Sequence, residues 1–218
     1  MLIIKPVASP TREGSMLNLD ELKSEFIKIS REAYARGLIS GAGGNLSVRI
    51  PGTEQILIKP SGTTFRELRP LLIDFKGNII EGTGKPSIEQ KLHIGIYTVR
   101  TDVGAVIHTH SPAATAFAVV GKEIPMVTAP ALIILRKCPL ISYAPPGSKR
   151  LAEYVVSTFK DTSVKTALLQ NHGVIAVGKN LTDALNNADL LEDTAKIAIL
   201  AFQIGKPKKI PKLSQNTD

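Results

Sequence analysis

Apolar positions in the first part of the chain have helical spacing between Asn18 and Gly37. The apolar members of this stripe are Leu22, Phe26, Ile29 and Ala33. Asn18 followed by Glu21 is typical of a helix start, and a glycine is typical of a helix end. The pattern therefore predicts one amphipathic helix that packs a single face against a core.

Several short segments that follow have the spacing of strands. Residues 46–50 alternate strictly between apolar and polar side chains, which predicts a half-buried strand, and residues 55–59 form another strand after the turn at Pro51 and Gly52. Residues 72–75 and 79–80 repeat this hairpin pattern around a turn at 76–78. Adjacent hairpins favour an antiparallel sheet.

The second half of the chain alternates helices with buried strands. Ser87 with Gln90 predicts a capping box, followed by a helical stripe of Ile88, Leu92, Ile96 and Val99. Further elements are expected at 103–109 (strand), from Pro112 (short helix), from Ser148 (helix), at 165–170 and 174–177 (strands) and from Thr182 (long helix). We expect a single α/β domain over residues 1–218, with a mostly antiparallel central sheet between helical layers, a core at about 19–203 and a basic tail at 204–218.

Composition agrees with a globular protein of one domain. The chain has 218 residues, of which 43% are hydrophobic and 21% charged, and its apolar runs are shorter than the ~20 residues of a membrane span. The first residues, Met1 to Pro6, lack the pattern of a secretion signal. One cysteine, Cys138, excludes an internal disulfide and fits a reducing compartment. We expect a cytoplasmic protein without membrane association.

The net charge of +8 raises the question of a nucleic-acid partner. The basic residues are scattered, however, and their one dense cluster, at 206–212, is typical of a solvated tail. The chain contains no tryptophan and only 5% aromatic residues, so base-stacking surfaces are not expected. We therefore expect no nucleic-acid partner.

Three of the four histidines occur where a metal site would need them. His108 and His110 are two residues apart on a predicted strand, so both imidazoles lie on one side of it, and His172 lies in a tight connection between strands. Three histidines without cysteine ligands are typical of a catalytic metal with an open coordination position. The alternative for the His-x-His pair is two partly exposed residues at the end of a strand.

Two other features could belong to the same site. Glu89 shares a helix face with His93, although a glutamate at a helix start is more typically a dipole or capping partner, and His93 is better explained as a hydrogen-bonded core residue than as a ligand. The turns at 41–45 and 60–62, with Asn45, Ser61 and Ser87, could cradle an anion with their N–H groups. Ordinary turns and a helix cap remain the alternative.

Five ordered segments together resemble the class II aldolase family, which includes L-fuculose-1-phosphate aldolase and related epimerases and dehydratases. The segments are Gly43-Gly-Asn-Leu-Ser-Val-Arg49, Ile58-Lys-Pro-Ser-Gly62, Lys85-Pro-Ser-Ile-Glu89, Val106-Ile-His-Thr-His110 and Leu169-Gln-Asn-His-Gly-Val174. The resemblance extends from about Leu19 to Phe202 and implies the family's fold, commonly as a homotetramer with active sites at subunit interfaces.

The resemblance also implies roles for single residues. His108, His110 and His172 would bind Zn²⁺ or another divalent ion, and Glu89 would be the catalytic acid/base that can also touch the metal. The positions that would grip the phosphate of a small sugar-phosphate substrate are Gly44, Asn45, Ser61, Gly62, Ser87 and, through its backbone N–H, Ile88.

The activity implied is a reversible carbon–carbon bond cleavage. A ketose 1-phosphate such as L-fuculose 1-phosphate would give dihydroxyacetone phosphate and an aldehyde through an enediolate stabilised by the metal. Alternatives on the same scaffold are a methylthioribulose-1-phosphate-type dehydratase, a pentulose-phosphate 4-epimerase and a non-catalytic metal- or protein-binding module.

Two features depart from the fucose-type aldolases. Ile88 stands where a second phosphate-binding serine is usual. The segment Leu132–Leu135 and the residues after Tyr154 lack the tyrosines that the bacterial enzymes use. The resemblance therefore leaves the aldehyde partner open.

Overall fold

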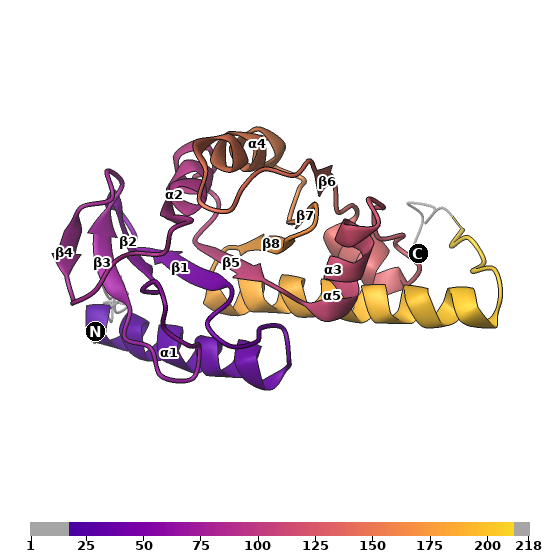
Figure 1. Cartoon of the computed structure of the whole chain (residues 1–218), viewed down its shortest axis with the longest axis horizontal. Helices are drawn as coiled ribbons and strands as arrows, with labels where there is room; N and C mark the ends of the chain where they lie inside the picture. The colour runs from indigo at the N-terminus through magenta and orange to yellow at the C-terminus, as the bar shows by residue number, and fades with distance from the viewer. Residues whose placement is uncertain (1–17, 212–218) are drawn as a thin grey trace, which may run out of the picture.

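The computed structural model describes residues 18–211 and forms a single α/β domain (Figure 1). Its elements in chain order are α1 (Leu19–Ala35), β1 (Asn45–Arg49), β2 (Gln55–Ile58), β3 (Leu71–Asp74), β4 (Ile79–Glu81), α2 (Gln90–Val99), β5 (Ala105–Thr109), α3 (Pro112–Val119), the short π-helix η1 (Ala131–Leu135), β6 (Leu140–Ile141), α4 (Lys149–Phe159), β7 (Thr166–Leu169), β8 (Gly173–Gly178) and α5 (Leu181–Ile204). Asn18 and Ser148 cap α1 and α4 as predicted.

The eight strands form one sheet in the order β4-β3-β2-β1-β5-β8-β7-β6. The predicted, mostly antiparallel sheet is confirmed: the pair β6 and β7 is parallel, and the other neighbours are antiparallel. The pairing puts β1, β5 and β8 side by side at the centre. His108 of β5 lies opposite Asn45 of β1 and opposite Ile175 of β8.

Helices cover both faces of the sheet, as Figure 1 shows. Helices α1 and α5 pack on one face, where Phe26 of α1 and Leu185 of α5 belong to the same buried cluster as Leu46 of β1. Helices α2 and α4 pack on the other, where Ile96 and Val155 meet inward residues of β2, β5 and β8. Period-two alternation along each strand therefore supplies apolar side chains to both faces of the sheet.

Strand β1 corrects one prediction. The strict alternation at 46–50 predicted a half-buried strand, yet Asn45 to Val48 are all buried. Helix α2 covers the polar face, and the Ser47 hydroxyl lies 2.7 Å from His93 Nδ1 and 2.8 Å from the Tyr97 hydroxyl. A polar face can be buried when each polar group finds a partner, and here the partners come from a distant segment.

The start of α2 corrects a second prediction. The capping box of Ser87 with Gln90 is not formed, because the helix begins at Gln90 with Glu89 at its N-cap. Ser87 Oγ accepts the backbone N–H of Glu89 at 3.2 Å instead. Ile88, predicted to begin the apolar stripe, lies before the helix and is 64% exposed. A turn thus precedes the helix and presents Glu89 at its end.

Helix α3 begins directly after the second histidine of the His-x-His pair. The buried carboxylate of Glu192 on α5 accepts the N–H groups of Ala113 and Ala114 at 3.1 and 2.9 Å. A negative charge at a helix N-terminus is favourable, so α5 anchors the chain where it leaves β5.

Within residues 18–211, no helix is both long and apolar enough to cross a membrane. The N-terminal segment Met1 to Pro6, expected to lack a secretion signal, and the end of the basic tail, 212–218, lie outside the described residues. The described part of that tail, 205–211, follows the end of α5.

Candidate functional site

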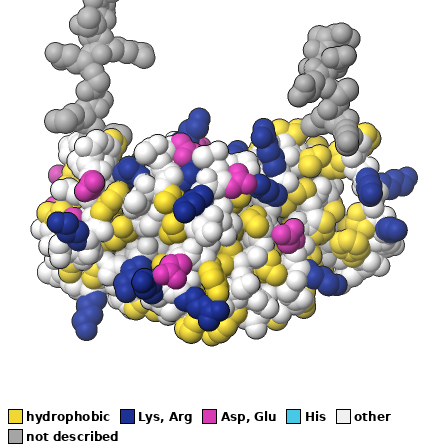
Figure 2. Space-filling model, turned by 90° about the horizontal axis from the view of Figure 1, so that it is seen from above, with side chains coloured by type: hydrophobic (Ala, Val, Ile, Leu, Met, Phe, Trp, Pro, Cys, Tyr) yellow, Lys and Arg dark blue, Asp and Glu magenta, His cyan; other side chains and the backbone are white. Residues whose placement is uncertain are grey.

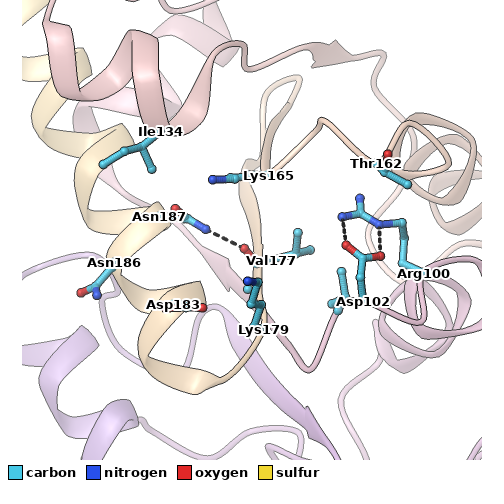
Figure 3. Close-up of a pocket in the computed structure, with 12 residues that line it drawn as sticks. Arg100, Asp102, Ile134, Thr162, Lys165, Val177, Lys179, Asp183, Asn186 and Asn187 are labelled. Atoms are coloured by element: carbon cyan, nitrogen blue, oxygen red, sulfur yellow. Dashed lines mark hydrogen bonds and ion pairs between the residues drawn. The ribbon is translucent and has the colours of Figure 1, made fainter. Parts of the chain in front are cut away.

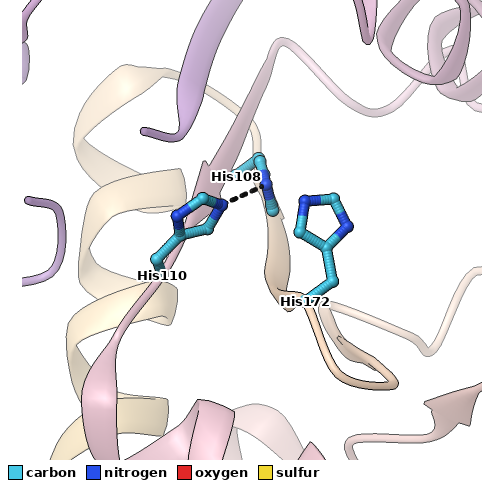
Figure 4. A group of neighbouring side chains, drawn as sticks. All are labelled: His108, His110 and His172. Atoms are coloured by element: carbon cyan, nitrogen blue, oxygen red, sulfur yellow. Dashed lines mark hydrogen bonds between the residues drawn. The ribbon is translucent and has the colours of Figure 1, made fainter. Parts of the chain in front are cut away.

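The three predicted histidines converge at the end of β5 and in the β7–β8 turn (Figure 4). Their ring centroids are 4.9 Å (His108 to His110), 4.7 Å (His108 to His172) and 5.4 Å (His110 to His172) apart. One ring nitrogen from each lies within 4.8 Å of the others. Strand periodicity predicted the shared side of His108 and His110, and the pairing of β5 with β8 adds His172.

Close backbone packing around these histidines depends on glycine. Gly44 has φ +66°, and a Cβ there would lie 2.6 Å from the carbonyl oxygen of His108. At Gly173 a Cβ would lie 2.3 Å from the Thr109 carbonyl oxygen. Any larger residue at either position would push β1 or β8 away from β5 and spread the cluster.

The ring nitrogens of the cluster suit a divalent cation. The Nδ1 of His108 donates to the Val174 carbonyl at 2.8 Å, which leaves its Nε2 lone pair free to face His110 Nε2 at 3.1 Å. Burial, and next the neighbouring His108, lowers the pKa of His110 and of His172 to about 4, against the opposing effect of the Glu89 carboxylate. Neutral imidazoles are the metal-binding form, so these residues fit a three-histidine metal centre at neutral pH.

Glu89 completes the cluster from the start of α2. Its Oε2 lies 3.3 Å from His108 Nε2, and its Oε1 lies 3.7 Å from His172 Nε2. Asn45 donates its amide N–H to Oε2 at 2.8 Å, whereas the buried Oε1 has no hydrogen-bond partner among the described residues. One carboxylate oxygen is therefore held, and the other is available.

The surroundings of Glu89 favour its ionised form. Burial alone would raise the pKa of this carboxyl, but the nearby His108 and the Asn45 hydrogen bond, together with His172 and His93, hold it below its ordinary value. A carboxylate that is 4% exposed and ionised at neutral pH is suited to accept a proton.

One cavity of about 340 Å³ contains nearly all of the predicted site. Its walls include the predicted residues Gly44, Asn45, Ser61, Gly62, Ser87, Ile88, Glu89, His110 and His172. The turns at 41–45 and 60–62 and the turn before α2 thus meet at one place, next to the histidines. His108 lies behind this wall, fully buried.

Sequence reasoning missed Lys59, which also lines the cavity. Its side chain is 2% exposed, and its ammonium donates to the carbonyls of Ala42 and Pro60 at 3.2 and 3.4 Å. Within residues 18–211 it forms no ion pair with a carboxylate. Burial lowers its pKa to about 8. The sequence signal was present, since Lys59 lies in the same segment as Ser61, but nothing in the pattern indicated that its side chain is buried.

A second cavity, of about 430 Å³, lies at the opposite ends of β5 and β8 (Figure 3). Two polar contacts lie within its walls: Arg100 forms an ion pair with Asp102 at 2.7 Å, and Asn187 donates to the Val177 carbonyl at 2.8 Å. On the face of the molecule drawn in Figure 2, the Lys and Arg side chains are dispersed and form no single patch. Among the described residues, the group of side chains placed to hold a metal ion is the histidine cluster at the other end of these strands.

Comparison with known proteins gives one family. The family described as "Class II Aldolase and Adducin N-terminal domain" matches residues 24–199. The chain is 37% identical to the L-fuculose phosphate aldolase of Methanocaldococcus jannaschii over 187 residues, which cover 84% of this chain and 99% of that protein. It is 33% identical to the 5-deoxy-D-ribulose 1-phosphate aldolase of Bacillus thuringiensis serovar kurstaki over 199 residues, covering 88% and 91% of the two chains.

A solved structure titled L-fuculose 1-phosphate aldolase has the same fold. Its TM-score is 0.83 with 32% sequence identity, and the match covers 91% of this chain and 94% of that one.

The geometry of the cluster generates a prediction about metal content. Purified wild-type protein should carry about one divalent ion per chain, and His172→Ala should lose most of it, because two imidazoles leave an incomplete site. Elemental analysis after dialysis measures this directly. The fourth histidine provides the control: His93→Gln should retain the ion, since the His93 nitrogens face Asn45 and Ser47. Full occupancy in His172→Ala would contradict the assignment.

Proposed function

The chain belongs to the family of the class II aldolase and adducin N-terminal domain, and we propose that it is a metal-dependent lyase that cleaves ketose 1-phosphates reversibly. The observation that carries this proposal is the convergence of three imidazoles and the Glu89 carboxylate at one wall of a cavity whose other wall is made of turns rich in N–H donors. The substrate would be of the L-fuculose 1-phosphate type, and the products would be dihydroxyacetone phosphate and an aldehyde.

Glu89 would move the proton in this reaction. In the direction of synthesis, its free oxygen Oε1 accepts a proton from the carbon next to the ketone of dihydroxyacetone phosphate, and in cleavage it returns that proton to the same carbon. A divalent ion, for which we propose Zn²⁺, held by His108, His110 and His172 would supply Lewis-acid stabilisation of the enediolate. Asn45 donates to Oε2, so Oε1, which has no hydrogen-bond partner among the described residues, would be the oxygen that faces the reacting carbon.

The phosphate would lie against the turns on the other wall. Gly44, Asn45, Ser61, Gly62, Ser87 and Ile88 line this part of the cavity, and their backbone N–H groups, with the side chains of Asn45, Ser61 and Ser87, would donate to the phosphate. Lys59 adds a positive charge that has no carboxylate partner among the described residues. A buried charge without a counter-ion is costly, so a bound phosphate would stabilise it. This charge offsets the hydroxyl that Ile88 lacks.

We also propose that the protein assembles as a homotetramer and acts in the cytoplasm. Large apolar side chains near the end of α5 support an assembly: Leu200, Phe202 and Ile204 are 57%, 55% and 89% exposed. The buried, unpaired Cys138 is consistent with a reducing compartment.

Product analysis tests the proposed reaction. We expect the metal-loaded protein to release dihydroxyacetone phosphate and an aldehyde from a ketose 1-phosphate, and to stop when a chelator removes the metal. Fuculose 1-phosphate and methylthioribulose 1-phosphate are the first substrates to compare, with products followed by NMR and a coupled dehydrogenase. Loss of water without aldehyde would indicate a dehydratase, and inversion without cleavage an epimerase. Unchanged substrates in the presence of bound metal would support a binding module.

The position of Lys59 gives a second prediction. Lys59→Met should raise the KM for the phosphorylated ketose by roughly tenfold to a hundredfold, because a hydrogen bond to a charged group is worth about 1.5–3 kcal/mol. The KM for the free ketose should change little. Because the pKa of Lys59 is about 8, its charge is present below that pH and is lost above it. The wild-type KM for the phosphate should therefore rise above about pH 8, and the variant should not show this rise.

Lys76→Met is the matched control, since Lys76 is exposed in the turn between β3 and β4. Its KM values should equal those of the wild type. Equal increases for phosphorylated and free ketose in Lys59→Met would mean that Lys59 supports the fold rather than the phosphate.

A further inference from the structure

Five polar side chains alternate between helix α2 and strand β1. We call them the polar ladder; in order they are Glu89, Asn45, His93, Ser47 and Tyr97. Four residues of helix advance about 6 Å and two residues of strand about 6.6–6.8 Å, so positions 89, 93 and 97 stay in step with positions 45 and 47. No member is more than 4% exposed.

The direction of each hydrogen bond in the ladder follows from chemistry. The ionised Glu89 only accepts, so the Asn45 amide turns its nitrogen to Glu89 Oε2 and its oxygen to His93 Nε2. An amide oxygen also only accepts, so His93 Nε2 must carry the proton. The state of the imidazole is thus dictated by the carboxylate two steps away.

The hydrogen bonds among His93, Ser47 and Tyr97 run in the same direction, with each donor on the side away from Glu89. With a proton on Nε2, the neutral His93 ring accepts at Nδ1, and the Ser47 hydroxyl 2.7 Å away donates to it. The Tyr97 hydroxyl, 2.8 Å from Ser47 Oγ, then donates to Ser47. Complete burial lowers the pKa of His93 to about 3, which keeps the ring neutral. Every donor therefore points toward Glu89.

An asparagine amide cannot orient itself, because turning it by 180° exchanges its oxygen and nitrogen at little cost in shape. With the His93 N–H fixed, the turned amide would place its NH₂ against another donor and its oxygen against the Glu89 carboxylate. Both contacts are repulsive. The His93 N–H and the Glu89 carboxylate thus hold the Asn45 amide from both sides in the one orientation that donates to Glu89.

We propose that His93 is a positioning residue, which acts through the Asn45 amide to hold Glu89 Oε2 and so direct Oε1 into the cavity. This inference rests on the proposed function, in which Glu89 moves the proton. A purely structural His93 would also be buried and hydrogen-bonded, so the test must separate the alignment of the carboxylate from the stability of the fold.

The first measurement is exchange of the carbon-bound hydrogen of dihydroxyacetone phosphate with solvent deuterium, at saturating substrate and with metal content measured. His93→Phe removes both ring nitrogens and should slow exchange by about 10- to 100-fold, with KM changed less than threefold and metal retained. His93→Gln restores a donor near the Nε2 position and should recover most of the rate.

Val155→Ala is the control for stability. Val155 is buried on α4 in the cluster that contains Ile96 and Tyr97 of α2, but it has no polar contact with the ladder. This variant should unfold at a lower temperature and keep the wild-type exchange rate. Wild-type exchange in His93→Phe, or a loss of exchange in Val155→Ala as large as in His93→Phe, would overturn the proposal.

The second measurement needs no substrate. The chain has four histidines, so the ring signals of ¹⁵N-histidine-labelled protein can be assigned by NMR. Near pH 7 these spectra should show His93 protonated on Nε2 and unprotonated on Nδ1. A neutral ring with its proton on Nδ1 would reverse the hydrogen bonds to Asn45 and Glu89 and refute the inference. If the wild type shows no deuterium exchange at all, the proposed function fails, and the NMR result still decides the direction of the ladder.

Discussion

Three imidazoles and a carboxylate converge on one small volume, where His108 and Glu89 are buried and His110 and His172 partly buried, and a divalent cation among them would stabilise this arrangement. A cation relieves the repulsion between nitrogen lone pairs, and it would add to the neighbouring groups that already hold the pKa of the buried Glu89 below its ordinary value. A divalent ion would satisfy the lone pairs of His108, His110 and His172 together. The Glu89 carboxylate, 3.3 Å from His108, would lie beside that ion, available for proton transfer.

The fold is arranged so that this cluster has no freedom to relax. β1 and β8 flank β5, and Gly44 and Gly173 let the three backbones approach within van der Waals contact. Glu192 holds the chain beyond His110, and the polar ladder holds the carboxylate. The positions of the reacting groups are set by elements rather than by loops alone, which is the condition for precise catalysis.

Local patterns in the sequence were sufficient to predict much of this arrangement. Period-two spacing correctly put His108 and His110 on one side of a strand, and helical stripes located the helices that cover the sheet. The predictions that were wrong concern chain segments where local and tertiary demands differ. Ser87 and Gln90 have the spacing of a capping box, but the chain turns once more before α2 begins, which exposes Ile88 and presents Glu89 at the N-cap.

What could not be predicted depends on contacts between distant residues. Nothing around Ser47 indicates that a helix more than 40 residues away will cover it, and the pairing of Asn45 with His93 spans 48 residues. Lys59 is similar, since a lysine in a strand pattern is ordinarily exposed. Its burial beside Phe65, with the ammonium 5.5 Å from the ring centroid, appears only when the sheet and the cavity are assembled.

The central claim, that Glu89 is the acid/base beside a three-histidine metal centre, is tested most directly by solvent deuterium exchange into dihydroxyacetone phosphate with Glu89→Gln. This variant keeps the size of the side chain and its polar contacts but cannot accept the proton. With metal occupancy verified, exchange should fall by about 10²- to 10⁴-fold, the usual contribution of general acid–base catalysis. Exchange at the wild-type rate would show that another base does the chemistry.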